Sequence, residues 1–167
     1  LHHHNLCQYV DSDNMMMNGS QYAWFVTEFV SGETLSQRII RDDEISVYEI
    51  KTIAKAVLSA LSFLHSQPIP VIHNEVTIQN VFLNLVGELQ DLKLIDFGYA
   101  RFLNQSPVKP NLDELNPFYL APERFSGVCS IQTDLYSVGV MMYHLLYGEL
   151  PWFLDVSRKR GQDVIDS

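Results

Sequence analysis

Cysteine and positive charge are scarce in this sequence. Its 167 residues include only two cysteines, Cys7 and Cys129, which follow no disulfide or metal-ligand spacing. Free thiols are typical of a reducing compartment, so we predict a cytoplasmic protein. Lys and Arg number 11 against 20 Asp and Glu, giving a net charge of -9. This charge repels nucleic acid and anionic membranes and argues against both as the main partner.

A long hydrophobic run and a glycine-rich phosphate loop are also missing. The most apolar helix-like stretch, Val138–Tyr147, is too short to cross a bilayer and contains His144, so we expect no membrane partner. The pattern G-x-G-x-x-G occurs nowhere in the chain. Hydrophobic residues nevertheless make up 47% of the sequence, which indicates a globular domain with a core.

Two short apolar runs lie near the middle of the chain. Val81–Leu85 and Leu92–Ile95 predict two strands, and the polar segment Val86–Asp91 is expected to join them as a hairpin. Asn80 precedes the first strand and Asp96 follows the second, so strand pairing would bring these two residues together. An amide oxygen and a carboxylate held together suit Mg2+, which prefers oxygen ligands.

The residues around this hairpin resemble the catalytic and magnesium loops of the protein kinase family. The family patterns are H-R-D-L-x-x-x-N and D-F-G; here His73–Asn80 reads H-N-E-V-T-I-Q-N and Asp96–Gly98 reads D-F-G. The resemblance implies ATP and Mg2+ as cofactors, with Asn80 and Asp96 as metal ligands. It also implies Glu75, Asn80 and Asp96 as catalytic residues, with Glu75 in place of the family's Asp.

Three departures from the family's catalytic loop weaken the expected phosphoryl transfer. Glu75 carries its carboxylate on a stem one methylene longer, and a misplacement of about 1 Å can cost roughly a hundredfold in rate. Thr77 replaces a Lys that neutralises the transferred phosphoryl group. Asn74 replaces an Arg, so no arginine at this position would meet a phosphorylated activation segment, and Ser106 is a weak candidate for such a switch.

The first thirty residues predict two strands, Gln8–Val10 and Tyr22–Val30, around a polar loop, Asp11–Ser20. Three consecutive methionines in that loop suggest a mobile tip or a partner surface. By itself Tyr22–Val30 reads as an ordinary core strand.

The second of these strands resembles the kinase strand 5 running into the hinge. On that match Thr27 is the gatekeeper, and the backbones of Glu28 and Val30 hydrogen-bond the adenine of ATP.

Ser46–Ser66 predicts an amphipathic helix. Ser46 with Glu49 forms a capping box, and Pro68 stops the helix. The apolar face consists of residues at three- and four-residue spacing: Ile50, Ile53, Ala54, Val57, Leu58, Leu61, Leu64 and His65.

A second helix is expected to begin with Thr133 as its N-cap and to stop at Gly148. It resembles the kinase helix F, in which Asp134 would anchor the backbone of the catalytic loop.

Between the D-F-G residues and this second helix, Tyr99–Leu120 predicts an irregular loop. By the resemblance it corresponds to the kinase activation segment. It leads into Ala121–Glu123, which reads A-P-E as in the family. Tyr119 stands where tyrosine kinases usually have Trp, which favours the Ser/Thr type.

The motifs occur in family order along nearly the whole chain. They predict an α+β, mainly α fold: a kinase C-terminal lobe at 31–167, truncated after helix F. Residues 1–30 would be a remnant of the N-terminal lobe, with strands 4 and 5 and the hinge. The expected partner is a protein substrate or a regulated protein.

Three functions follow from this resemblance. The first is a Ser/Thr-type kinase domain with a degenerate catalytic loop, acting as a nucleotide-binding pseudokinase or weak kinase. The second is a fully active Ser/Thr protein kinase with Glu75 as base. The third is an interaction module that binds no nucleotide.

Overall fold

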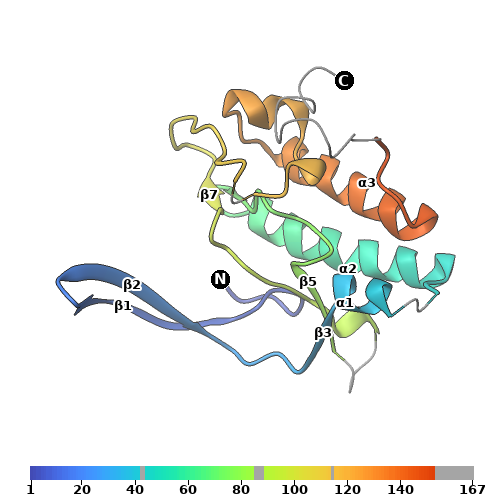
Figure 1. Ribbon diagram of the computed structural model, residues 1–167, viewed down its shortest axis with the longest axis horizontal. Helices are drawn as coiled ribbons and strands as arrows, with labels where there is room; N and C mark the ends of the chain where they lie inside the picture. Colours follow the sequence, from blue (N-terminus) through green and yellow to red (C-terminus); the bar gives the residue numbers. More distant parts are fainter. Residues whose placement is uncertain (42–43, 85–88, 114, 153–167) are drawn as a thin grey trace.

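The computed structural model describes residues 1–41, 44–84, 89–113 and 115–152. Two helices packed side by side and several small antiparallel sheets form the body, and one long hairpin extends away from it (Figure 1). In chain order the helices and strands are β1 Tyr9–Met17, β2 Ser20–Thr27, β3 Gly32–Thr34, α1 Leu35–Ile40, α2 Val47–His65, β4 Val71–Ile72, β5 Val81–Asn84, β6 Lys93–Leu94, β7 Arg101–Phe102 and α3 Ile131–Tyr147.

Helix α2 confirms the predicted amphipathic helix. Ser46 caps it: its hydroxyl accepts from the Glu49 N–H at 3.3 Å, and the Glu49 carboxylate accepts from the Ser46 N–H at 2.9 Å. The predicted apolar face is buried except at two positions: Leu58 is 38% exposed, and His65 is partly buried. Leu58 lies at the edge of the apolar stripe, beside a shallow groove toward the start of α3.

Helix α3 begins earlier than predicted, and the assignment of Thr133 as its N-cap is wrong. The N-cap is Ser130, whose N–H donates to the Thr133 hydroxyl at 3.3 Å, while that hydroxyl donates to the Ser130 carbonyl at 2.6 Å. Because Ser130 and Thr133 satisfy one another's hydrogen-bonding groups across the first turn, the helix starts at Ile131. Its predicted end is confirmed, since Gly148 adopts φ 73° and donates to the His144 carbonyl.

The polar loop predicted at Asp11–Ser20 is also wrong, because nearly all of it is strand. Strands β1 and β2 pair from Tyr9 with Thr27 to Met17 with Ser20. The turn is the two-residue Asn18–Gly19, with φ of 53° and 78°. Positive φ at both positions is what a type I′ turn requires, and Asn-Gly is its strongest sequence signal, which the interpretation as a loop overlooked.

The central hairpin is confirmed, with shorter strands than expected. Val81 pairs with Leu94 and Phe82 with Lys93, and β3 adds to the other edge of β5 to give the order β3-β5-β6. Residues 85–88, which are the end of the first predicted strand and the start of the predicted connection, lie outside the described residues, and Leu89–Asp91 forms a short 3-10 turn.

The predicted loop Tyr99–Leu120 is irregular for most of its length, with two exceptions. Strand β7 pairs with β4, and Pro117–Tyr119 forms a 3-10 turn. The region beyond helix α3 that the sequence assigned to the end of the C-terminal lobe, residues 153–167, lies outside the described residues.

The hydrophobic core lies between helices α2 and α3 and the β5–β6 hairpin. Ile53, Leu61 and Leu64 of α2 are fully buried, as is Met141 of α3. Within the described part of the chain, no helix combines the length and apolar character needed to cross a membrane.

Candidate functional site

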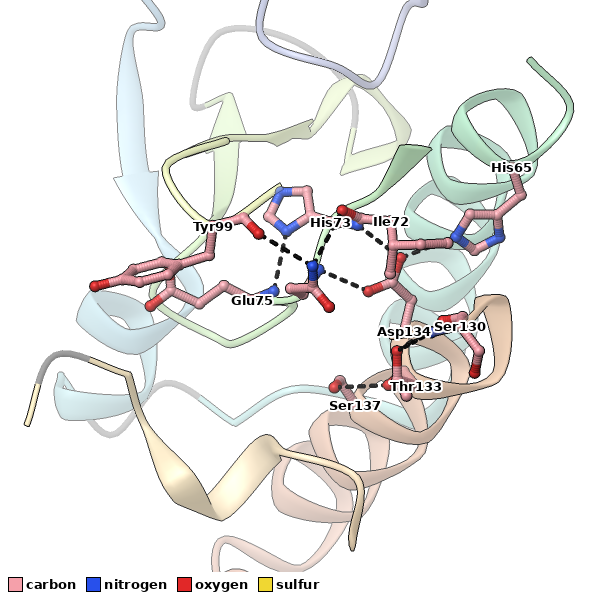
Figure 2. A network of polar contacts seen from close by, with 10 residues as sticks. His65, Ile72, His73, Glu75, Tyr99, Ser130, Thr133, Asp134 and Ser137 are labelled. Atoms are coloured by element: carbon pink, nitrogen blue, oxygen red, sulfur yellow. Dashed lines mark hydrogen bonds and ion pairs between the residues drawn. The ribbon is translucent and has the colours of Figure 1, made fainter. Parts of the chain in front are cut away.

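A buried carboxylate on helix α3 holds the loop that follows β4. Asp134 is fully buried, and its Oδ2 accepts from the His73 N–H at 2.9 Å, while its Oδ1 accepts from the Asn74 N–H at 2.8 Å. His65, in the last turn of α2, reaches Oδ2 with Nε2 at 2.9 Å. Figure 2 shows this junction of two helices and one loop. The predicted anchoring role of Asp134 is therefore seen in its contacts.

His73 links this loop to the strand that carries Asp96. Its Nε2 lies 3.2 Å from the Ile95 carbonyl, and its Nδ1 lies 3.3 Å from the Glu75 N–H. A ring that donates from Nε2 and accepts at Nδ1 is neutral. Burial also lowers the pKa of His73, against the opposing charge of Asp134. The ring packs on Phe97 at a centroid distance of 5.1 Å.

Strand pairing brings the two predicted metal-binding residues to one place. The Ile95 N–H donates to the Asn80 carbonyl at 2.9 Å, so Asp96 follows directly on a residue bonded to Asn80. Asp96 adopts φ 63°, is exposed, and accepts from the Gly98 N–H at 2.9 Å. Asn80 is buried, and its Nδ2 donates to the Glu75 carbonyl at 2.9 Å, which leaves its amide oxygen as the acceptor.

Glu75 lies near both of these residues and is half-buried. Burial raises the pKa of its carboxyl, and the charge of Asp96 raises it further, while the Asn80 amide acts in the opposite direction. Its Oε2 is buried and has no hydrogen-bond partner among the described residues. An oxygen without a partner and with raised proton affinity is suited to accept a proton.

A cavity of about 710 Å3 is lined by residues from both predicted parts of a nucleotide site, although no residue of the loop 73–80 is among them. Thr27, Glu28 and Val30 line one part of it, and the Asp96–Gly98 segment lines another. Thr27 ends β2 and is exposed. The Glu28 N–H donates to the Gln8 carbonyl at 2.8 Å, and the Glu28 carbonyl accepts from the Cys7 thiol at 3.8 Å, so both backbone groups of Glu28 have partners within the protein.

The order of these residues along the chain and their contacts in the structure fit one protein family. The family model described as "Protein kinase domain" matches residues 1–167. The chain belongs to the protein kinase family.

Three curated relatives that match the chain are each described as a serine/threonine-protein kinase. The pakC protein of Dictyostelium discoideum is 32% identical over 90% of this chain and 31% of its own length. TIO of Arabidopsis thaliana is 34% identical over 92% of the chain and 11% of its own length. PAK 5 of Rattus norvegicus is 31% identical over 99% of the chain and 22% of its own length. The chain therefore spans less than a third of each of these kinases.

In kinase terms, Tyr119, just before the A-P-E triplet, is fixed to helix α3. The Tyr119 hydroxyl lies 2.7 Å from His144 Nδ1, and the Ser137 hydroxyl donates to the Tyr119 carbonyl at 2.7 Å. Burial raises the pKa of Tyr119. The activation segment is thus held at its end by the same helix whose Asp134 holds the catalytic loop.

Sequence reasoning missed two contacts of this kinase site. His65 was assigned to the apolar face of α2, although a histidine among core residues is itself a sign of a buried polar partner. Lys93 Nζ lies 2.9 Å from Glu28 Oε1 and so ties β6 to the segment that follows β2. No short-range pattern marks this ion pair, because its residues are far apart in the chain.

Proposed function

We propose that this chain is the nucleotide-binding part of a Ser/Thr-type protein kinase domain in which Glu75 makes phosphoryl transfer weak or absent. The observation that carries this proposal is the cavity that Thr27, Glu28 and Val30 share with Asp96. Pockets of about 300–1,000 Å3 are of the size that holds small ligands.

In this proposal, residues 1–30 form the remnant of the N-terminal lobe and residues 31–167 form the C-terminal lobe as far as helix F. Strands β1 and β2 take the place of kinase strands 4 and 5. Helix α2 supports the catalytic loop, and α3 is helix F, because it supplies the anchoring Asp134.

The proposal assigns the nucleotide to the cavity, and it assigns the metal to Asp96, which lines the cavity, together with Asn80, which does not. In this proposal the backbones of Glu28 and Val30, which line the cavity, bond adenine, with Thr27 as gatekeeper. The Asp96 carboxylate and the Asn80 amide oxygen are the hard oxygen donors that Mg2+ prefers, with water completing its shell. Mg2+, when bound, neutralises charge on the phosphate oxygens.

Glu75 is assigned the role of accepting the proton of a protein hydroxyl. The longer Glu stem misplaces this carboxylate by about the distance that costs roughly a hundredfold, and Thr77 supplies no cation beside it. We therefore place the chain among nucleotide-binding pseudokinases or weak kinases.

One observation favours the alternative, a fully active kinase with Glu75 as base. The buried Oε2 of Glu75 without a partner and the raised pKa of this carboxyl are properties of a proton acceptor. The rate of phosphoryl transfer measured on Glu75→Asp, whose side chain is one methylene shorter, distinguishes the weak kinase from the fully active kinase.

The proposed partner is a protein, either a substrate hydroxyl or a protein regulated by the nucleotide-bound form. The free thiols Cys7 and Cys129 support a cytoplasmic setting for this proposal.

The test is ATP binding in the presence of Mg2+, followed by transfer of labelled phosphate to a protein substrate mixture. We would measure the chain beside Asp96→Ala and Glu75→Asp, with Asp113→Ala, which is exposed and outside the cavity lining, as the matched control. We expect Asp96→Ala to weaken Mg2+-dependent binding at least tenfold and Glu75→Asp to raise a slow transfer rate.

Fast transfer by the unaltered chain that falls in Glu75→Asp would instead establish the active kinase. Absence of ATP binding by the unaltered chain would overturn the proposal and leave the interaction module.

A further inference from the structure

The activation segment begins with a strand that is held directly on the catalytic loop. In β7, Phe102 pairs with Val71 and Arg101 with Ile72 of β4. The Leu103 N–H donates to the Pro70 carbonyl at 2.8 Å.

Asn74 adds a side-chain link to the same segment. Its Nδ2 donates to the Tyr99 carbonyl at 3.0 Å, two residues before β7, and lies 3.5 Å from the Ile72 carbonyl. Asn74 is 3% exposed, so solvent competes little for these bonds. Both partners are carbonyl oxygens, so only a donor is useful at this position.

The backbone at Asn74 explains why asparagine suits the position. Its φ is 64°, in the left-handed region, and its N–H is fixed by Asp134. Asparagine tolerates this conformation better than most residues. The kinase motif has Arg here, whose charged group is suited to a phosphate. Asn74 instead binds the neutral backbone of the segment.

We propose that Asn74 is a positioning residue that holds the start of the activation segment against the catalytic loop without any phosphate. The amide oxygen supports this assignment, because Asn74 Oδ1 is buried and has no hydrogen-bond partner among the described residues. The donating end of the amide thus carries the stabilising contact. The regulatory meaning rests on the proposed kinase function, but the structural link does not.

The experiment is hydrogen exchange on the chain without nucleotide, after mass spectrometry has shown it to be unphosphorylated. We expect the amides of β7 and of Leu103, the residue that follows it, to be protected, Leu103 above all because its N–H donates to the Pro70 carbonyl. In Asn74→Gly, which keeps the left-handed backbone and removes the side chain, these amides should exchange roughly three- to tenfold faster, as expected for the loss of one hydrogen bond. Amides of helix α2 should not change, which separates a local role from general destabilisation.

The matched control is Asn18→Gly. Asn18 has a similar φ of 53° but is exposed in the β1–β2 turn, so its replacement should leave β7 unchanged. Asn74→Asp is the second variant, because it keeps the shape and sets a carboxylate oxygen against the Tyr99 carbonyl. It should speed β7 exchange at least as much as Asn74→Gly.

A phosphorylated form of the chain tests whether a phosphate adds to the protection of β7. Ser106 is the only Ser or Thr between Tyr99 and Leu120. A chain carrying phosphoserine at this position should show β7 protection within twofold of the unmodified chain. Unprotected β7 amides in the unphosphorylated chain, protection that appears only with the phosphate, or equal effects of Asn74→Gly and Asn18→Gly would overturn the proposal. Failure of ATP binding would leave these exchange results unaffected and would count only against the proposed function.

Discussion

The β1–β2 hairpin and the catalytic loop both contain an asparagine in the left-handed conformation, yet they are held in opposite ways. In the hairpin, Asn18 sits in a two-residue turn between strands that are exposed along almost their whole length. In the loop, Asn74 is buried and its backbone is fixed by Asp134, sixty residues later in the chain. The same local conformation therefore comes from turn chemistry in one region and from a tertiary contact in the other.

This difference determines how far the effect of a substitution extends through the molecule. The hairpin buries little against the body, so a defect in its turn stays within it (Figure 1). The loop shares Asp134 with both long helices, so loss of that carboxylate affects the loop and the core together.

The largest expected effect comes from removing the carboxylate that the loop depends on. Asp134→Ala leaves the N–H groups of His73 and Asn74 and the ring of His65 buried without their acceptor. We expect it to lower the free energy of unfolding by about 3–5 kcal/mol in urea denaturation. The matched control, Asp13→Ala on exposed β1, should change it by less than about 0.5 kcal/mol. Similar losses in both variants would contradict the contrast between the regions.

A smaller and local effect is expected in the turn of the hairpin. Gly19 adopts φ 78°, and an added Cβ would meet no atom within 4 Å, so Gly19→Ala has only a conformational cost. That cost is about 1–2 kcal/mol for a left-handed L-residue. Hydrogen exchange should show faster exchange in β1 and β2 with α2 unchanged. Loss of protection in α2 as well would show that the hairpin is coupled to the core.

The smallest effect is a pH dependence at Glu75. The pKa of the Glu75 carboxyl is raised in the folded protein. Its contribution to the stability of the fold is therefore most favourable below the unfolded pKa, near 4.5, and is lost as pH rises through the folded pKa. We would measure the free energy of unfolding of Glu75→Gln and of the unaltered chain from pH 4 to pH 7. The value for Glu75→Gln minus the value for the unaltered chain should therefore increase as pH rises. A constant difference, or one that moves the other way, would refute the burial of this carboxylate.

Much of the fold was predictable because its signals are local. The capping box at Ser46 and the apolar spacing that follows it placed helix α2, and two short apolar runs placed β5 and β6. The errors also concern local signals: Asn18–Gly19 forms the turn of a hairpin where the sequence predicts a loop, and the N-cap of α3 is Ser130, not the predicted Thr133.

The order of the kinase motifs, the start of α2, the stop at Gly148 and the family itself were determined by the sequence alone, because each depends on residue types at fixed short spacings. Only the tertiary structure decided that Asp134 receives three donors, that Glu75 is partly desolvated beside Asp96, and that Asn74 reaches Tyr99. These contacts join residues far apart in the chain. Their strength comes from burial and exact distance, which no short pattern of residues encodes.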